Sequence, residues 1–166
     1  MANESKYEKY VHRVDGQLYE SFVIKDDEGK KIQQIDIPLK VELKIQDLLE
    51  ILVGASILAV PVAFTEEVWN MGNDLGWFNI ILLNFVCLIF MGSFMYFKGY
   101  RNRLEMYRNE YLKRLFSTFF LSVLIVAILL TIVGKCPWIT DPDLALKRIL
   151  IGSFPASMSA TVTDSF

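Results

Sequence analysis

The sequence contains one histidine, His12, and only two cysteines, Cys87 and Cys136. With a single imidazole, we expect neither a histidine-based metal site nor a histidine-dependent catalytic triad. Cys87 lies inside an apolar run and Cys136 just after another. We expect the two thiols to lie at different depths and therefore predict no disulfide.

Motifs of catalysis and of nucleotide binding are also missing. There is no CxxC pair, nucleophile elbow or P-loop. We therefore expect neither enzymatic activity nor a cofactor, although a bound monovalent or divalent cation is compatible with the sequence. The net charge of −2 and the separation of the 17 basic residues into several segments give no indication of nucleic-acid binding. The polar start MANESKYEKY predicts no cleavable signal peptide.

Long apolar runs are what the sequence does have, and hydrophobic residues make up 53% of it. The second and third runs have 21 and 19 residues, enough to cross about 30 Å of hydrocarbon at about 1.5 Å per residue. We predict an all-α membrane protein with four transmembrane helices in a membrane domain of residues 45–166. The predicted spans are about 47–69, 77–97, 116–134 and 147–165.

The N-terminal segment, residues 1–44, has a different pattern. QLYESFVIK is rich in strand formers, DDEG is a turn signal, and KIQQIDI alternates apolar and polar residues. We predict a β-hairpin over residues 17–39, ended by Pro38 because proline cannot donate a ladder hydrogen bond.

Lysine and arginine counts predict the orientation. The first 50 residues hold 8 basic residues, loop 65–76 holds none, loop 98–114 holds 6, and loop 135–146 holds Lys135 alone. Basic residues favour the cytoplasmic side, so we predict a multi-pass protein of the cell membrane with both termini cytoplasmic. Lys147 and Arg148 would then begin the fourth span on the outer side, against this rule.

The segment RNRLEMYRNEYLKRLF is basic and amphipathic. One interpretation is a solvated helix that obeys the positive-inside rule. The other is a site for anionic lipid headgroups at residues 101–114.

The first apolar run, 51–64, is only 14 residues long and must be extended from its flanks. Either Asp47 and Glu50, or Glu66 and Glu67, or some of each, are drawn towards the bilayer, and we expect the latter pair to lie within the helix. Pro61 should break the helix, since it removes one backbone hydrogen bond.

The fourth run, GSFPASMSATVTDS, is rich in hydroxyl side chains and contains Pro155, a second expected helix break. Such a helix should face other helices or a wet cavity. ILVG at 51–54 is echoed by ILIG at 149–152, and an acid follows a threonine at the same distance from each glycine, at Glu66 and Asp164. This echo is either chance or an inverted repeat of the kind found in transporters.

The stretches ILVGASILAVPVAFTEEVW and SFPASMSATVTDS resemble a family of small prokaryotic integral membrane proteins of unknown function. The family pattern has a first helix with glycine and proline that ends in an acid and a tryptophan, and a later Pro-Ala-Ser stretch that ends in an acid. The resemblance covers about residues 45–166 and leaves the hairpin outside. It implies a helical membrane domain and no particular activity.

The leading hypothesis is a cation channel or transporter subunit, with the first and fourth spans lining the path. Four helices rarely enclose a pore alone, so we expect a homo-oligomer in the lipid bilayer. The candidate path residues are Glu50, Glu66, Glu67, Ser157, Thr161, Thr163 and Asp164. These acids could instead be solvated at the interface or paired with Lys147 or Arg148. The alternative function is a scaffold or regulator that acts through the hairpin and the basic loop.

Overall fold

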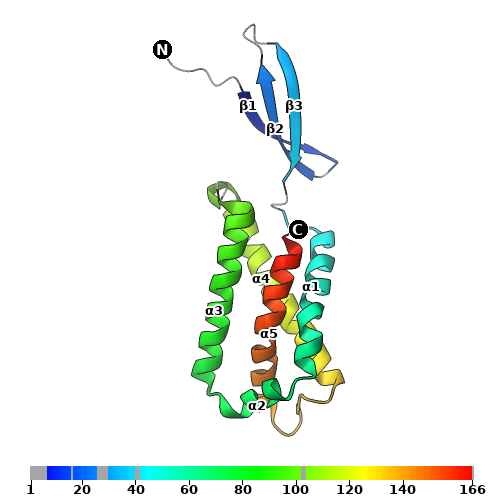
Figure 1. The fold of residues 1–166 in the computed structure, drawn as a ribbon, viewed down its shortest axis with the longest axis vertical. Coiled ribbons are helices and arrows are strands. Elements are labelled where there is room, and N and C mark those ends of the chain that lie inside the picture. Colours follow the sequence, from blue (N-terminus) through cyan, green and yellow to red (C-terminus); the bar gives the residue numbers. More distant parts are fainter. Residues whose placement is uncertain (1–6, 16, 26–29, 40–41, 102–103, 166) are drawn as a thin grey trace. The chain divides into compact units, whose positions relative to one another are not determined.

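The computed structural model describes residues 7–15, 17–25, 30–39, 42–101 and 104–165. The chain forms two compact units, Met1–Glu42 and Leu43–Phe166 (Figure 1). The first unit is a β-sheet and the second is a bundle of helices.

The sheet has three antiparallel strands in the order β1 (Tyr7–Val14), β2 (Gln17–Lys25) and β3 (Lys31–Pro38). The predicted hairpin is present as β2 and β3, with Tyr19 opposite Pro38, and its DDEG turn lies outside the described residues. The prediction of a two-stranded hairpin is wrong in one respect, because β1 adds a third strand along β2. Charged residues occur throughout YEKYVHRV, so this segment lacks the strong apolar alternation that indicates a strand.

A polar cluster crosses the three strands on one face of the sheet. Ser21, which is fully buried, donates a hydrogen bond to the carboxylate of Asp36, and His12 Nδ1 lies 3.0 Å from the Ser21 hydroxyl. Gln34 donates a second bond to the same Asp36 oxygen at 2.9 Å. The hydrogen bond from Ser21 is the main cause that lowers the pKa of Asp36 below its ordinary value.

Replacing Ser21 with alanine is therefore expected to raise the pKa of Asp36 towards its ordinary value. A carboxyl whose pKa is lowered by folding stabilises the fold at neutral pH, and this contribution is lost as the pH falls through the folded-state pKa. The measurement is an NMR titration of the Asp36 carboxyl carbon in the full chain. Gln34→Ala is the matched control and should give a smaller rise, because the bond from Gln34 is the lesser cause. An unchanged titration in Ser21→Ala would contradict this assignment.

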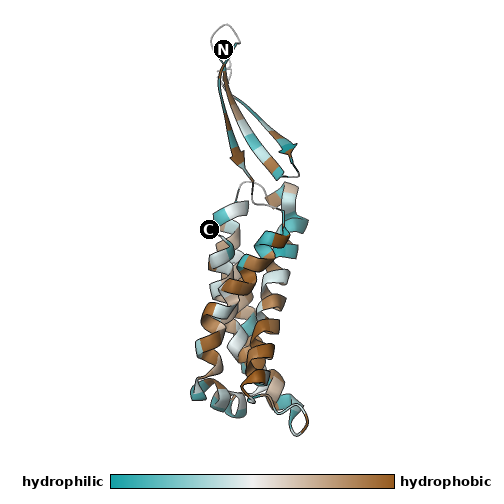
Figure 2. Ribbon diagram, turned by 90° about the vertical axis from the view of Figure 1, so that its right-hand side faces the viewer, coloured by the Kyte–Doolittle hydropathy of each residue, from teal (hydrophilic) through white to brown (hydrophobic). Residues whose placement is uncertain are grey.

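The described residues of the second unit form five α-helices and a short π-helix. Three segments are long and apolar enough to cross a membrane among the described residues: Ile45–Ala63, Trp77–Tyr100 and Leu104–Ile132. Figure 2 shows hydrophobic residues along most of the helical unit and hydrophilic residues gathered towards its ends. The elements are α1 (Ile45–Ala63), α2 (Glu66–Asp74), α3 (Trp77–Met95), η1 (Tyr96–Tyr100), α4 (Leu104–Ile132) and α5 (Pro142–Asp164).

The first helix is extended at its N-terminal flank. α1 takes in Asp47 and Glu50 but ends at Ala63, so the expectation that Glu66 and Glu67 continue this helix is wrong. The reason lies in the last turn, where Pro61 interrupts the hydrogen-bond ladder. The Thr65 hydroxyl donates to the Pro61 carbonyl at 2.7 Å, and the chain then turns into α2.

α5 runs through the helical unit in contact with α1, α2, α3 and α4 (Figure 1). Its N-terminus is capped by Asp141, whose side chain accepts from the Leu144 N–H at 3.0 Å, and Pro142 begins the helix. The helix continues unbroken through Pro155, so the expected break there is not found. A membrane helix can contain proline without a break where neighbouring helices pack against it, as they do against α5.

Small residues explain how α5 is accommodated among the other helices. A Cβ built on Gly54 of α1 would lie 2.7 Å from the Thr163 side chain and 3.0 Å from the Ala160 backbone. On α5 itself, a Cβ on Gly152 would lie 3.0 Å from Val126 of α4. The sequence-based expectation that this polar helix faces other helices is confirmed by the burial of Ser153, Ser157 and Thr161.

Candidate functional site: a buried charge cluster

Arg114 lies at the centre of a group of charged side chains inside the helical unit. Its Nε and Nη2 atoms donate to the two carboxylate oxygens of Asp164 at 2.7 and 3.0 Å. The same Nη2 lies 3.1 Å from Asp47 Oδ2. Arg114, Asp47 and Asp164 are 4%, 7% and 3% exposed. Two aspartates therefore share one buried guanidinium, and the pair with Asp164 has the bidentate geometry that strengthens such contacts.

Three helices bring these residues together. Asp47 lies in the first turn of α1, where it also accepts the Lys44 backbone N–H at 2.9 Å. Asp164 is the last residue of α5, at the end of the helix whose partial negative charge disfavours a carboxylate. Arg114 comes from the interior of α4 and offsets this repulsion at Asp164.

A third carboxylate, that of Glu50, lies beside the two aspartates. Asp47, Glu50 and Asp164 each place one carboxylate oxygen within 4.8 Å of the others. Glu50 follows Asp47 by three residues, so α1 presents both acids on one face. We call Asp47, Glu50, Arg114 and Asp164 the charge cluster.

The π-helix η1 brings an aromatic ring to the charge cluster. Its last residue, Tyr100, is 2% exposed and lies beside Arg114. The Tyr100 ring meets that of Tyr111 edge-on, with centroids 5.3 Å apart, and the Tyr111 hydroxyl donates to the Gly92 carbonyl at 3.0 Å. A π-turn of this kind shifts the register of a helix, and such turns often occur at functional sites.

The structure divides the predicted path residues into separate groups. Glu50 and Asp164 meet in the charge cluster, whereas Glu66 and Glu67 are exposed in the first turn of α2. Ala63, at the end of α1, lies 13 residues after Glu50, and this separates the two groups by about 20 Å along the helix.

The predicted hydroxyl residues lie in the last two turns of α5, before Asp164. Thr161 and Thr163 donate to the carbonyls of Ser157 and Ser159 at 2.8 and 3.0 Å, four residues back in the same helix. Ser157 is fully buried in the middle of the bundle. The described contacts thus place these hydroxyls within helix packing.

The basic residues at the start of α5 have other partners than Glu66 and Glu67. Lys147 Nζ lies 3.3 Å from Asp143 Oδ2. Arg148 donates to the backbone carbonyls of Trp69 and Lys135 at 3.1 and 2.7 Å, and so ties α5 to α2 and to the loop after α4.

Two residues of the charge cluster, Asp47 and Arg114, are not among the predicted path residues. Asp47 was expected only as an acid near the bilayer, whereas no role inside the helical unit was predicted for Arg114. It was grouped with the basic residues of 101–114, which were expected to face solvent or lipid headgroups. A signal was present in the sequence, because Thr118 and Ser122 follow Arg114 at intervals of four and mark a polar face. All three residues are buried, and each hydroxyl donates to the carbonyl four residues before it at 2.8 Å.

Comparison with known families identifies the chain at the family level. Residues 15–163 match the family described as "Putative integral membrane protein (DUF2391)". The predicted resemblance is confirmed, and it extends further than expected, because the match begins before the β-hairpin. The comparisons with curated proteins and with solved structures gave no significant match. The match spans most of the 166 residues, and the chain therefore belongs to the DUF2391 family of integral membrane proteins.

Proposed function

We propose that this protein is a subunit of a membrane transport system in which the charge cluster binds a cation or a proton. The observation that carries the proposal is that Asp47 and Asp164 share Arg114 in a site where all three are less than a tenth exposed. Glu50 adds a third carboxylate close to both. Like charges at low dielectric repel strongly, and a bound proton or cation relieves that repulsion.

The arrangement of α5 supports four crossings. Its 23 residues measure about 34 Å, enough for the hydrocarbon core, and its polar side chains are sheltered by the helices around it. An even number of crossings places both ends of the helical unit on one side of the membrane. The protein would lie in the cell membrane. The basic residues of 98–114 favour an orientation in which the end of the helical unit that holds the charge cluster faces the cytoplasm.

Tight packing between α1 and α5 favours a carrier over an open channel. Gly54 lies so close to Thr163 and Ala160 that a path along this contact requires the two helices to separate. Because Asp47 belongs to α1 and Asp164 to α5, a proton or cation bound at the charge cluster changes the electrostatic interaction between these two helices. We further propose that the protein acts without a cofactor, is not an enzyme, and works as a homo-oligomer.

A scaffold or regulator is the second candidate. The observation that favours it is the set of apolar side chains exposed on one face of the sheet, including Val11, Ile35 and Ile37. Removal of residues 1–40 separates the two candidates, since it should abolish a scaffold role and leave most transport.

The experiment is cation and proton flux through the purified protein in liposomes. Glu50→Gln is expected to reduce flux by about tenfold, equivalent to ~1.4 kcal/mol. Glu66→Gln and Glu67→Gln are matched controls, because they remove the same charge from exposed positions at the other end of α1. Loss of flux in Glu66→Gln and Glu67→Gln alone would show that the binding site lies on α2, at the two glutamates that the sequence predicts as path residues. No flux of K⁺, Na⁺, Ca²⁺ or H⁺ through the folded protein would favour the scaffold.

A further inference from the structure

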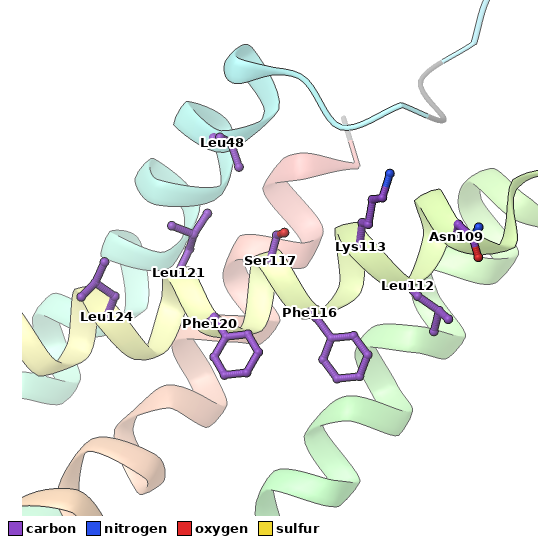
Figure 3. Close-up of a pocket in the computed structure, with 9 residues that line it drawn as sticks. All are labelled: Leu48, Asn109, Leu112, Lys113, Phe116, Ser117, Phe120, Leu121 and Leu124. Carbon is purple, nitrogen blue, oxygen red and sulfur yellow. The ribbon is translucent and has the colours of Figure 1, made fainter.

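A groove of about 750 Å³ runs along the outer surface of α4, next to α1. Figure 3 shows the lining side chains along α4, with Leu48 contributed by the neighbouring α1. The lining residues of α4 form two adjacent rows, and members of each row stand four residues apart, which is the spacing of residues along one ridge of a helix. One row is Asn109, Lys113, Ser117 and Leu121, joined by Leu48 of α1, and the other is Leu112, Phe116, Phe120 and Leu124.

The groove changes from polar to apolar along its length. Its polar members, Asn109, Lys113 and Ser117, are gathered at the end nearer the start of α4. The remaining members are apolar, and the rings of Phe116 and Phe120 are 46% and 64% exposed. This gradient is that of one membrane leaflet, with a polar headgroup region above hydrocarbon.

The dimensions of the groove fit one lipid acyl chain. Leu124 follows Lys113 by 11 residues, which is about 16 Å along the helix and close to the ~15 Å that is half of a hydrocarbon core. We propose that this groove binds one anionic glycerophospholipid, with its phosphate at Lys113 and Ser117 and one acyl chain between Phe120 and Leu121.

The polar end of the groove has the groups to hold a phosphate. Lys113 supplies a cation, and its side chain is 64% exposed. Within the part of the chain that the structure describes, the side chains of Asn109 and Ser117 have no hydrogen-bond partner, so both can donate to a ligand. Residues 98–114 carry 6 basic residues against the two acids Glu105 and Glu110, which attracts an anionic headgroup.

A neighbouring helix of a second copy fits the groove less well than a lipid. Membrane helices pack through small residues that let backbones approach, as Gly54 and Ala160 do between α1 and α5. The groove is instead lined by leucine and phenylalanine, with a lysine at its polar end. An acyl chain can follow such a surface because it adapts to the spaces between large side chains.

The test uses the full chain, stripped of lipid in detergent, and native mass spectrometry with phosphatidylglycerol or phosphatidylcholine of identical acyl chains. We expect phosphatidylglycerol to bind about fivefold more tightly, the effect of one lysine near an anionic group. Lys113→Gln should abolish this preference. Glu110→Gln should increase it, because Glu110 lies 2.7 Å from Lys113 and competes with the phosphate.

Arg108→Gln is the matched control. It removes one positive charge from an exposed residue of the same helix that does not line the groove. It should keep the preference for phosphatidylglycerol nearly intact. Equal binding of the two lipids, or an equal loss in Arg108→Gln and Lys113→Gln, would overturn the proposal in favour of diffuse surface charge. A dimer that persists in excess lipid and is broken by Phe120→Ala would assign the groove to a second copy instead.

Discussion

Replacing Arg114 with glutamine is expected to lower the free energy of unfolding of the helical unit by about 3–5 kcal/mol. The guanidinium holds Asp164 through two hydrogen bonds and Asp47 through a third contact, and all three side chains are buried. Without it, two buried carboxylates face each other and lose their charge partner. The measurement is denaturant unfolding of the purified protein in mixed micelles, followed by circular dichroism.

Lys113→Gln is the matched control for Arg114→Gln, because it removes the same charge from the adjacent residue. Its side chain is 64% exposed, and its ion pair with Glu110 is of the surface kind that contributes about 0–1 kcal/mol. Adding Asp47→Asn and Asp164→Asn to Arg114→Gln should recover part of the loss, because residues in one network are not additive. Equal stabilities of the two single variants would show that the charge cluster does not hold the three helices together.

Replacing Gly54 with alanine is expected to destabilise the helical unit by about 1–3 kcal/mol. In an exposed helix the same change is favourable by about 1 kcal/mol, because alanine has the higher helix propensity. Here the new methyl group would lie 2.7 Å from Thr163 and 3.0 Å from the Ala160 backbone, so α1 and α5 must move apart. The measurement is the same denaturant unfolding experiment. A lower free energy of unfolding in Gly54→Ala indicates close packing of α1 and α5, whereas a higher one indicates that helix propensity decides the effect.

Gly99→Ala is the control for Gly54→Ala. Among the described residues, no atom lies within 4 Å of a Cβ built at Gly99, so this variant should be as stable as the parent protein or slightly more stable. Gly54→Val should be worse than Gly54→Ala, because its larger side chain requires a larger separation. A stabilising effect of Gly54→Ala would mean that α1 and α5 do not depend on close contact here.

Most of the fold could be predicted from the apolar runs and from the charges in the loops. Runs of 19 and 21 residues can satisfy their backbone groups in hydrocarbon only as helices, so α3 and α4 follow from composition and length. The polarity of α5 likewise predicted its burial, because hydroxyl side chains in such a helix need partners other than lipid. The third strand was not predicted, because its pairing with β2 depends on contacts that the local pattern of β1 expresses weakly. The end of α1 at Ala63 was placed too late, although its local cause, Pro61, is present in the sequence.

The candidate site depended on packing in a way that no local pattern expresses. The sequence by itself determined that acids flank the short first and fourth runs, and that a basic segment precedes the third. Only the tertiary structure decided that Asp47 and Asp164, 117 residues apart, share Arg114, while Lys113 beside it stays at the surface. The physical reason is helical rotation: neighbouring residues on a helix point about 100° apart, so the packing of α4 against α1 and α5 selects which base is buried.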